Sequence, residues 1–271
     1  MKIAFVGGGN MAGALIGGLL GKGYAAGDLS VIEVIPQARA SLTSRYKVHV
    51  SESADARTFG ADTIMLAVKP QDMRSAVGPL KGKLDAQLVI SIAAGIRLED
   101  LSRWLGGYRK LVRVMPNTPA LVGAGISGLY AGAEVSTEER KRAEAILNAV
   151  GKTVWVEDEA LIDPVTAVSG SGPAYVFFFI ESLEKAGVEL GLTPEAARTL
   201  AIQTFVGASR LAAESTEPPG TLRERVTSKG GTTEAALKVF AAEDLAGRIG
   251  KALRAASDRG AELGRILGKD T

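Results

Sequence analysis

A glycine-rich segment near the start of the chain has the spacing of a dinucleotide-binding turn. Gly7, Gly9 and Ala12 form a G-x-G-x-x-A pattern between the apolar runs IAFV and ALIGGLL. In a strand-turn-helix unit the first glycine permits a tight turn, the second lets the backbone approach a pyrophosphate, and the small third residue permits close packing. Free amides at the helix N-terminus favour the phosphates. The pattern predicts a bound dinucleotide, also contacted by Asn10 and Met11; a loop without a ligand is the alternative.

An acidic residue further along bears on which dinucleotide is bound. Glu33 lies 33 − 12 = 21 residues after Ala12, close to the spacing of about 20 at which a carboxylate meets the adenosine ribose. A carboxylate there accepts ribose hydroxyls and repels a 2′-phosphate, which favours NADH. Two alternatives stay open: Glu33 is a solvated strand-end residue, or nearby Arg39 serves a 2′-phosphate.

Further turns are predicted to reach the same edge of a parallel sheet, where ligands of doubly wound folds bind. Lys69 follows the expected strand Thr63–Val68, and Pro70 keeps its backbone extended. We expect Lys69 to lie beside the nicotinamide or the phosphates, as a candidate catalytic residue. The alternative is that Lys69 is a surface lysine. The small residues Ala93 and Ala94 follow the expected strand Leu88–Ile92 and let a flat ring approach the backbone. Asn117 is the polar side chain in the turn after the expected strand Leu111–Met115. The cofactor-binding candidates in these turns are Ala67, Val68, Lys69, Pro70, Ala93, Ala94 and Asn117.

Two turns rich in hydroxyl groups and glycine precede helices in the second half of the chain. In the segment 169–175, SGSGPAY, Pro173 is expected at the first helical position behind exposed amides that can hold a carboxylate. The segment 226–234, VTSKGGTTE, leads into the helical pattern AALKVF. Two anion-binding helix starts indicate a small carboxylate substrate, although the first of them alone is more typical of a good helix cap.

The elements that must position these residues alternate between strand and helix in the first half of the chain. This alternation predicts an α/β fold, a Rossmann-type doubly wound and mostly parallel sheet. A helix between the last two strands has Ser136 as its N-cap, Glu139 three residues later, and Gly151 past its end. The expected strands are Lys2–Val6, Ser30–Val34, Val48–Val50, Thr63–Val68, Leu88–Ile92, Leu111–Met115, Gly125–Ala131 and Thr153–Glu157.

Strand signals stop after Glu157, which predicts a Rossmann domain over residues 1–160 and an all-helical domain for substrate binding and dimerisation over 161–271. The helix Val176–Leu183 is apolar on nearly all sides, as in a core or a subunit interface. One apolar seam follows the last helix and indicates packing within the monomer or, more strongly, subunit association. The seam consists of Leu245, Ile249, Leu253, Ala256, Gly260, Leu263 and Leu267.

Composition excludes several kinds of site. The chain of 271 residues has a formal charge of 32 − 30 = +2 and no cysteine, and His49 is its single histidine. Disulfides, thiolate chemistry and a multi-histidine metal site are therefore excluded, and no metal is expected. Because the chain has no basic block, no leader pattern and no long apolar run, we expect a cytoplasmic protein that binds neither nucleic acid nor membrane.

Six segments make the sequence recognisable, and they occur in the order GGGNMAGALIGGL, AVKP, SIAAG, RVMPNTPALV, VSGSGPAYVFFFIE and TSKGGTTEAAL. Together they resemble the pyrroline-5-carboxylate reductase family over essentially the whole chain. Many dehydrogenases share the glycine motif, whereas MPNTP, SGSGPAY and the GGTT turn are specific. The resemblance implies reduction of the ring C=N of 1-pyrroline-5-carboxylate to L-proline with NADPH or NADH, and a helical domain that interlocks with a partner's in a homodimer or larger homo-oligomer.

The resemblance also implies which residues hold the substrate. In this family the GGTT turn carries the carboxylate and imine contacts, which correspond here to Ser228, Gly230, Gly231, Thr232 and Thr233. Lys229 departs from the proline that is common before the glycine pair, which changes the rigidity of the turn and adds a charge near the carboxylate.

The expected chemistry agrees with the composition. A cyclic imine is protonated far more easily than a ketone, and its iminium form accepts a hydride readily, so neither zinc nor a histidine acid is required. Positioning the C=N against the nicotinamide supplies most of the rate. The Thr233 hydroxyl is expected to relay the proton to the ring nitrogen.

Two other functions fit the sequence less well. A β-hydroxyacid dehydrogenase also joins a Rossmann domain to a helical domain, but it needs a lysine on the first helix of the substrate domain, and residues 163–181 contain none. A regulatory protein that binds a dinucleotide without turnover would show no imine-dependent oxidation of NADPH.

Overall fold

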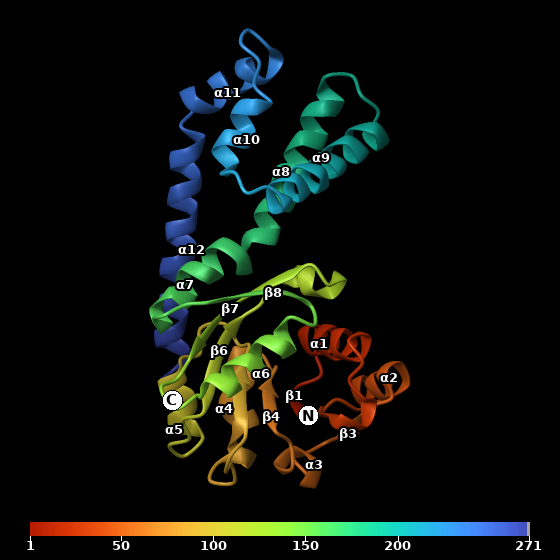
Figure 1. The fold of residues 1–271 in the computed structure, drawn as a ribbon, viewed down its shortest axis with the longest axis vertical. Helices are drawn as coiled ribbons and strands as arrows, with labels where there is room; N and C mark the ends of the chain where they lie inside the picture. The colour runs from red at the N-terminus through yellow and green to blue at the C-terminus, as the bar shows by residue number, and fades with distance from the viewer. Residues whose placement is uncertain (270–271) are drawn as a thin grey trace. The chain divides into compact units, whose positions relative to one another are not determined.

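An eight-stranded sheet forms the centre of the first part of the chain in the computed structural model, which describes residues 1–269 (Figure 1). The strand order is β3-β2-β1-β4-β5-β6-β7-β8, and all neighbouring strands are parallel except β6 and β7. This confirms the predicted doubly wound, mostly parallel sheet. The strands are β1 (Ile3–Val6), β2 (Leu29–Ile32), β3 (His49–Ser51), β4 (Thr63–Leu66), β5 (Leu88–Ser91), β6 (Leu111–Met115), β7 (Gly125–Ala131) and β8 (Gly151–Trp155).

The topology creates a ligand edge. From β1 the chain proceeds outward to β2 and β3, then returns to β4 on the other side of β1 and continues outward in the opposite direction. The order therefore reverses between β1 and β4, and in open α/β sheets ligands bind outside the carboxyl ends of the strands at such a switch point.

Helices cover both faces of the sheet because its central strands are apolar on both sides. Every residue of β1, β4 and β5 is buried, as expected for parallel strands. One core cluster joins the sheet to α1 (Asn10–Gly21), α2 (Pro36–Tyr46) and α6 (Thr137–Leu147). The opposite cluster joins it to α4 (Met73–Val77) and α5 (Leu98–Trp104). Shorter elements are α3 (Ala56–Phe59), η1 (Ala26–Asp28), η2 (Pro70–Asp72), η3 (Gly78–Leu80), η4 (Thr118–Val122), η5 (Glu159–Leu161), α7 (Ile162–Val165) and the π-helical turn η6 (Thr166–Gly170).

The capping box of α6 is confirmed, but the predicted helix end and last strand are displaced. Ser136 Oγ accepts the Glu139 amide at 3.2 Å, and Glu139 Oε2 accepts the Ser136 amide at 2.8 Å. The C-cap is Asn148, so Gly151 lies past the helix end as predicted but is not the residue that terminates the helix. Gly151 instead begins β8 and pairs with Gly125, whose carbonyl oxygen leaves no space for a Cβ atom. Close approach of two backbones explains this glycine.

Contacts divide the chain into two compact units. The first contains Met1–Ser171 together with the residues from Ala255 onward, and the second contains Gly172–Arg254. The second unit is wholly helical apart from its turns, with α8 (Gly172–Glu189), α9 (Pro194–Glu214), α10 (Pro219–Arg225), α11 (Thr232–Ala242) and the first part of α12 (Leu245–Leu267). The domain division after residue 160 stays a prediction, and residues 270 and 271 of the predicted second domain lie outside the described residues.

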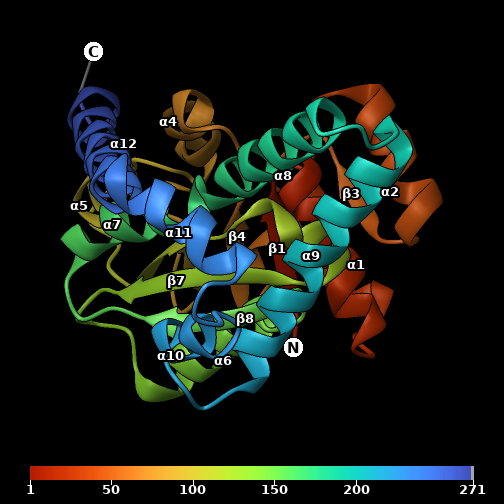
Figure 2. The same ribbon diagram turned by 90° about the horizontal axis from the view of Figure 1, so that it is seen from above.

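The last turns of α12 belong to the first unit and pack within it. Leu267 packs against the core cluster that includes Trp104, the Gly268 carbonyl accepts Arg103 Nη2 at 2.6 Å, and α12 lies beside α5 (Figure 2). A Cβ on Gly264 would lie 3.0 Å from the Gly95 carbonyl oxygen. This end of the predicted seam therefore packs within the monomer.

The second unit leaves large apolar side chains in solvent. Among residues 172–254, Ala197 and Ala201 are the buried ones. Phe177 and Phe178 of α8 are 66% and 64% exposed, so the alternative that the apolar segment Val176–Leu183 lies in a monomer core is wrong. Exposed apolar surface on this scale is typical of a subunit interface.

Candidate active site

The glycine-rich turn after β1 has the geometry of a pyrophosphate site. Gly7 has a φ of +97°, and a Cβ there would lie 2.7 Å from the Ala67 carbonyl oxygen and 2.8 Å from Val68 Cγ1. Gly9 is the N-cap of α1, and no atom lies within 4 Å of its Cβ position. The turn thus contacts the end of β4 on one side and leaves open space at the helix N-terminus, as the G-x-G-x-x-A pattern requires.

Glu33 lies directly after β2 and is bonded to the glycine turn. Its Oε2 accepts the Gly8 amide at 3.0 Å, and its Oε1 accepts the Ile35 amide at 2.9 Å. Sequence reasoning missed Gly8, where a Cβ would collide with Leu42. The middle glycine in the run GGG was the available signal.

The other edge residues lie at the carboxyl ends of β4 and β5. Ala67 and Val68 are half-buried beside Gly7, and Lys69 is exposed as the N-cap of η2. After β5, Ala93 is buried and Ala94 is half-buried. The structure therefore places the predicted cofactor residues of these strands at the switch-point edge.

Asn117 is engaged within the protein. Its Oδ1 accepts the Ile126 amide at 2.9 Å, and its Nδ2 donates to the Ser169 carbonyl at 3.2 Å. It therefore ties the turn after β6 to both β7 and η6. The predicted contact of Asn117 with the cofactor stays a prediction.

The helix α8 begins at Gly172, so Pro173 is its second residue and not the first, as the sequence predicted.

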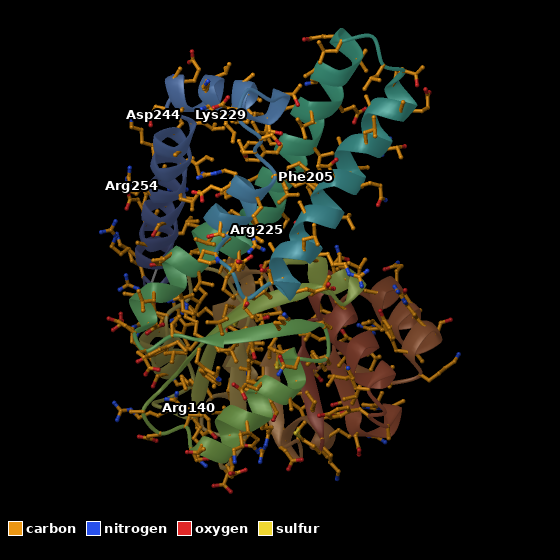
Figure 3. The ribbon with its side chains drawn as sticks, turned by 45° about the horizontal axis from the view of Figure 1, so that its top comes forward. Arg140, Phe205, Arg225, Lys229, Asp244 and Arg254 are labelled. Carbon is orange, nitrogen blue, oxygen red and sulfur yellow. The ribbon has the colours of Figure 1, made fainter. Side chains whose placement is uncertain are left out.

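The predicted substrate turn lies in the second unit. Ser228 accepts the Gly231 amide through its carbonyl at 3.0 Å, and Gly230 adopts a φ of +74°. The helix α11 begins at Thr232, and its N-cap, Gly231, provides no side-chain cap. Thr233 therefore does not cap this helix through its hydroxyl. Thr233 is half-buried, and Lys229 is exposed (Figure 3).

Glu234 holds the substrate turn, and sequence reasoning missed it. Its Oε2 accepts the Gly230 amide at 2.8 Å and lies 3.5 Å from Lys238 Nζ. In a capping box the third helical residue accepts the amide of the N-cap, whereas Glu234 accepts the amide of Gly230, one residue before the N-cap Gly231. The order of Gly231, Thr232 and Glu234 was the available signal.

A buried arginine in β6 was also missed. Arg113 is 3% exposed, and its Nη1 and Nη2 lie 3.2 Å from Glu159 Oε1 and 3.4 Å from Asp163 Oδ1. The same Glu159 oxygen accepts the Leu98 amide at 2.8 Å. This network joins β6 to the start of α5 and to η5 and α7. An arginine inside the apolar run LVRVM was its signal.

Neither a metal-binding cluster nor a membrane-spanning helix is found in residues 1–269. In residues 1–269, no group of three or more His, Asp or Glu side chains is placed to hold a metal ion. Over the same described part of the chain, no helix combines the length and the apolar character needed to cross a membrane.

Comparisons with known proteins cover both parts of the chain. Residues 159–263 match the family model for pyrroline-5-carboxylate reductase dimerisation, and residues 2–95 match that for NADP oxidoreductase, coenzyme F420-dependent. The chain is 46% identical to the pyrroline-5-carboxylate reductase of Pseudomonas aeruginosa over 269 residues, covering 99% of this chain and 98% of the relative.

Solved structures agree with these sequence matches. The structure of a pyrroline-5-carboxylate reductase from Coxiella burnetii matches with a TM-score of 0.92 and 40% identity, covering 97% of this chain and 98% of that one. The Plasmodium falciparum pyrroline carboxylate reductase with NADP bound matches with a TM-score of 0.85 and 30% identity, covering 97% and 98%.

Proposed function

Because this chain belongs to the pyrroline-5-carboxylate reductase family, we propose the following roles for its residues in that reaction. The enzyme reduces the C=N bond of 1-pyrroline-5-carboxylate to L-proline with NAD(P)H, the last step of proline biosynthesis. The observation that carries this function is the 46% identity that extends over 99% of the chain.

The reaction balances without a metal. The reduced nicotinamide supplies a hydride to the imine carbon and becomes NAD(P)⁺, while the ring nitrogen gains a proton and C=N becomes CH–NH. The protein's own residues must bind both molecules, align the imine carbon, and provide for the proton.

The residues at the switch-point edge fit a dinucleotide. The positive φ of Gly7 and the open space at Gly9 supply the turn and the approach that a pyrophosphate needs. We assign the pyrophosphate to the turn that Gly7, Gly9, Asn10 and Met11 form, where the first amides of α1 have no partner within the helix. The nicotinamide side is assigned to the turns after β4 and β5, namely Ala67, Val68, Lys69, Pro70, Ala93 and Ala94, with Asn117 after β6.

The substrate carboxylate is assigned to the start of α11. The amides of Gly230 and Gly231 are already bonded to Glu234 and to the Ser228 carbonyl. The first amides of α11, those of Thr232 and Thr233, have no acceptor within the helix and point out of its N-terminus. We therefore assign the carboxylate to these two amides, and the glycines and Ser228 shape the turn.

Proton transfer is assigned to Thr233. No hydrogen bond of its hydroxyl is found within residues 1–269, so the oxygen is available to a ligand. A hydroxyl both accepts and donates, which suits it to the ring nitrogen of a molecule whose carboxylate lies on the neighbouring amides. Lys69 adds an exposed positive charge on the cofactor side.

The enzyme carries the dimerisation region of its family and is a homo-oligomer. We propose that the exposed face of α8 and the first half of α12 form the dimer contact, because Phe177, Phe178 and Ile249 are exposed apolar residues. A cytoplasmic location without a membrane or nucleic-acid partner is part of this proposal, which the net charge of +2 supports.

A steady-state assay tests the proposed function. The purified protein is mixed with 1-pyrroline-5-carboxylate and either NADPH or NADH, and loss of reduced cofactor is compared with formation of L-proline in equal amounts. Oxidation of the cofactor that does not depend on the imine, or no oxidation with either cofactor, would refute the function.

A further inference from the structure

The segment that follows β2 decides which dinucleotide fits the edge of the sheet. In a doubly wound fold this segment meets the adenosine ribose, where NADH carries a 2′-hydroxyl and NADPH a 2′-phosphate. The inference below rests on the proposed function, since it concerns the cofactor of that reaction.

The Glu33 carboxylate is fixed in place by two backbone amides. The Gly8 amide on one oxygen belongs to the pyrophosphate turn, and the Ile35 amide on the other belongs to the loop that leads into α2. A carboxylate has about four acceptor positions, so two remain for ribose hydroxyls. Because both oxygens are held, the negative charge cannot turn away from a 2′-phosphate without breaking these bonds.

Arg39, the cation nearest in sequence, is engaged elsewhere. Its Nη1 donates to the carbonyl oxygens of Glu33 and Val34, each at 2.9 Å. Its Nη2 lies 3.5 Å from Glu52 Oε2, and its side chain is 24% exposed. Together Glu33, Arg39 and Glu52 carry a net charge of −1, so the guanidinium leaves no positive charge in excess for a phosphate.

The rest of the loop provides no substitute for Arg39. Residues 33–38 are EVIPQA, which contain no lysine, arginine, serine or threonine. Val34 and Ile35, the two residues directly after Glu33, are 69% and 54% exposed and apolar, and the neutral amide of Gln37 is the one uncharged donor side chain that the loop presents.

We propose that Glu33 is a specificity-determining residue and that it makes this reductase select NADH over NADPH. The carboxylate accepts the 2′- and 3′-hydroxyls of NADH and opposes the 2′-phosphate of NADPH by like-charge repulsion. Its bond to Gly8 also couples the ribose position to the pyrophosphate turn.

Binding and turnover are measured together on the full-length wild type and on Glu33→Gln. Calorimetric titration with NAD⁺ and NADP⁺ gives the two dissociation constants, and steady-state kinetics with NADH and NADPH gives the two kcat/KM values. We expect wild type to favour the form without the 2′-phosphate in both measurements. In Glu33→Gln we expect that preference to fall by roughly tenfold, since the charge is lost while one amide acceptor remains.

Glu99→Gln is the matched control, because it removes a negative charge that is 71% exposed and lies on α5, where it pairs with Arg97 rather than with Arg39. Its preference is expected to stay within about twofold of wild type. Ionic strength gives a second readout: salt screens repulsion between charges, so the wild-type preference for NAD⁺ should weaken as salt rises and that of Glu33→Gln should not.

Wild-type affinity for NADP⁺ equal to or greater than that for NAD⁺ would overturn the proposal whatever the variant does. An unchanged preference in a folded Glu33→Gln protein would also overturn it. If the proposed function is wrong, the imine is not reduced with either cofactor, yet the binding preference is still measured.

Discussion

Replacing Thr233 with alanine separates a chemical role for its hydroxyl from a structural one. In the structure the hydroxyl makes no hydrogen bond within residues 1–269, and Gly231 is the N-cap of α11. Alanine is a better helix former than threonine by a few tenths of a kcal/mol. We therefore expect the free energy of unfolding to change by less than about 0.5 kcal/mol, whereas loss of a side-chain cap would cost about 1 kcal/mol.

The expected kinetic effect is much larger than the effect on stability. A positioned proton donor contributes about 10²- to 10⁴-fold, but an iminium can also take its proton from water before it binds. Thr233→Ala should therefore lower kcat/KM by about 10- to 1000-fold. This range is below the full contribution of a proton donor because water supplies part of the proton, and it includes the loss of one hydrogen bond to the substrate. Cofactor affinity should be little changed.

Three variants, Thr233→Ala, Thr233→Ser and Thr232→Ala, are compared with wild type in the assay. Thr233→Ser retains a hydroxyl and should keep kcat/KM within a few-fold of wild type, and Thr232→Ala should raise KM more than it lowers kcat. Each is measured by steady-state kinetics, thermal unfolding and titration with the oxidised cofactor. A lower melting temperature with unaltered kcat/KM in Thr233→Ala would refute the catalytic assignment, as would equal loss in the serine variant.

Three other expectations concern the second unit and the sheet. Leu253→Glu places a charge on the apolar seam of α12 and should reduce the sedimenting mass of the native oligomer; a wild type that sediments as a monomer at micromolar concentration would contradict this. Glu234→Ala frees the Gly230 amide and should raise KM for the imine about tenfold, because a hydrogen bond to a charged group is lost. Glu234→Gln should keep a KM near that of wild type. An unchanged KM in the alanine variant would show that Glu234 does not hold the turn. Burial raises the pKa of Asp55, but hydrogen bonds from His49 and Thr58 outweigh it and hold that pKa below the ordinary 3.8. The ionised carboxylate therefore stabilises the fold above that pH, and its contribution disappears as pH falls through the lowered pKa. Denaturation of wild type and Asp55→Asn should thus differ at neutral pH and converge in acid, and a difference that grows in acid would contradict the assignment.

Local signals were sufficient for the framework of the fold. Near-continuous apolar runs located the strands to within two or three residues at each end, because a parallel strand buried on both faces needs such a run. The capping box of Ser136 and Glu139 was predictable because both partners lie within one helical turn. Gly7 was predictable because only glycine readily adopts the positive φ that this turn requires.

Signals that depend on distant partners were misread or missed. Gly151 has the spacing of a helix terminator, but the Gly125 backbone, which joins it only in the sheet, decides its role. Arg113 meets Glu159 and Asp163 across 46 and 50 residues of sequence. Glu234 is close to its partner, yet its contact depends on the left-handed backbone of Gly230.

The sequence by itself determined the α/β class, the glycine turn and the family, and it located the turn before α11, since each rests on spacing within a short stretch of chain. Tertiary structure alone decided which groups remain free to bind. It joined Glu33 to Gly8 and Arg39 to backbone carbonyls, bonded the amides of Gly230 and Gly231 within their turn, and split the α12 seam between a packed end and an exposed one. The physical reason is that a hydrogen-bonding group or an apolar face is available only after the folded chain has taken its other partners, and those partners are set by the fold rather than by spacing.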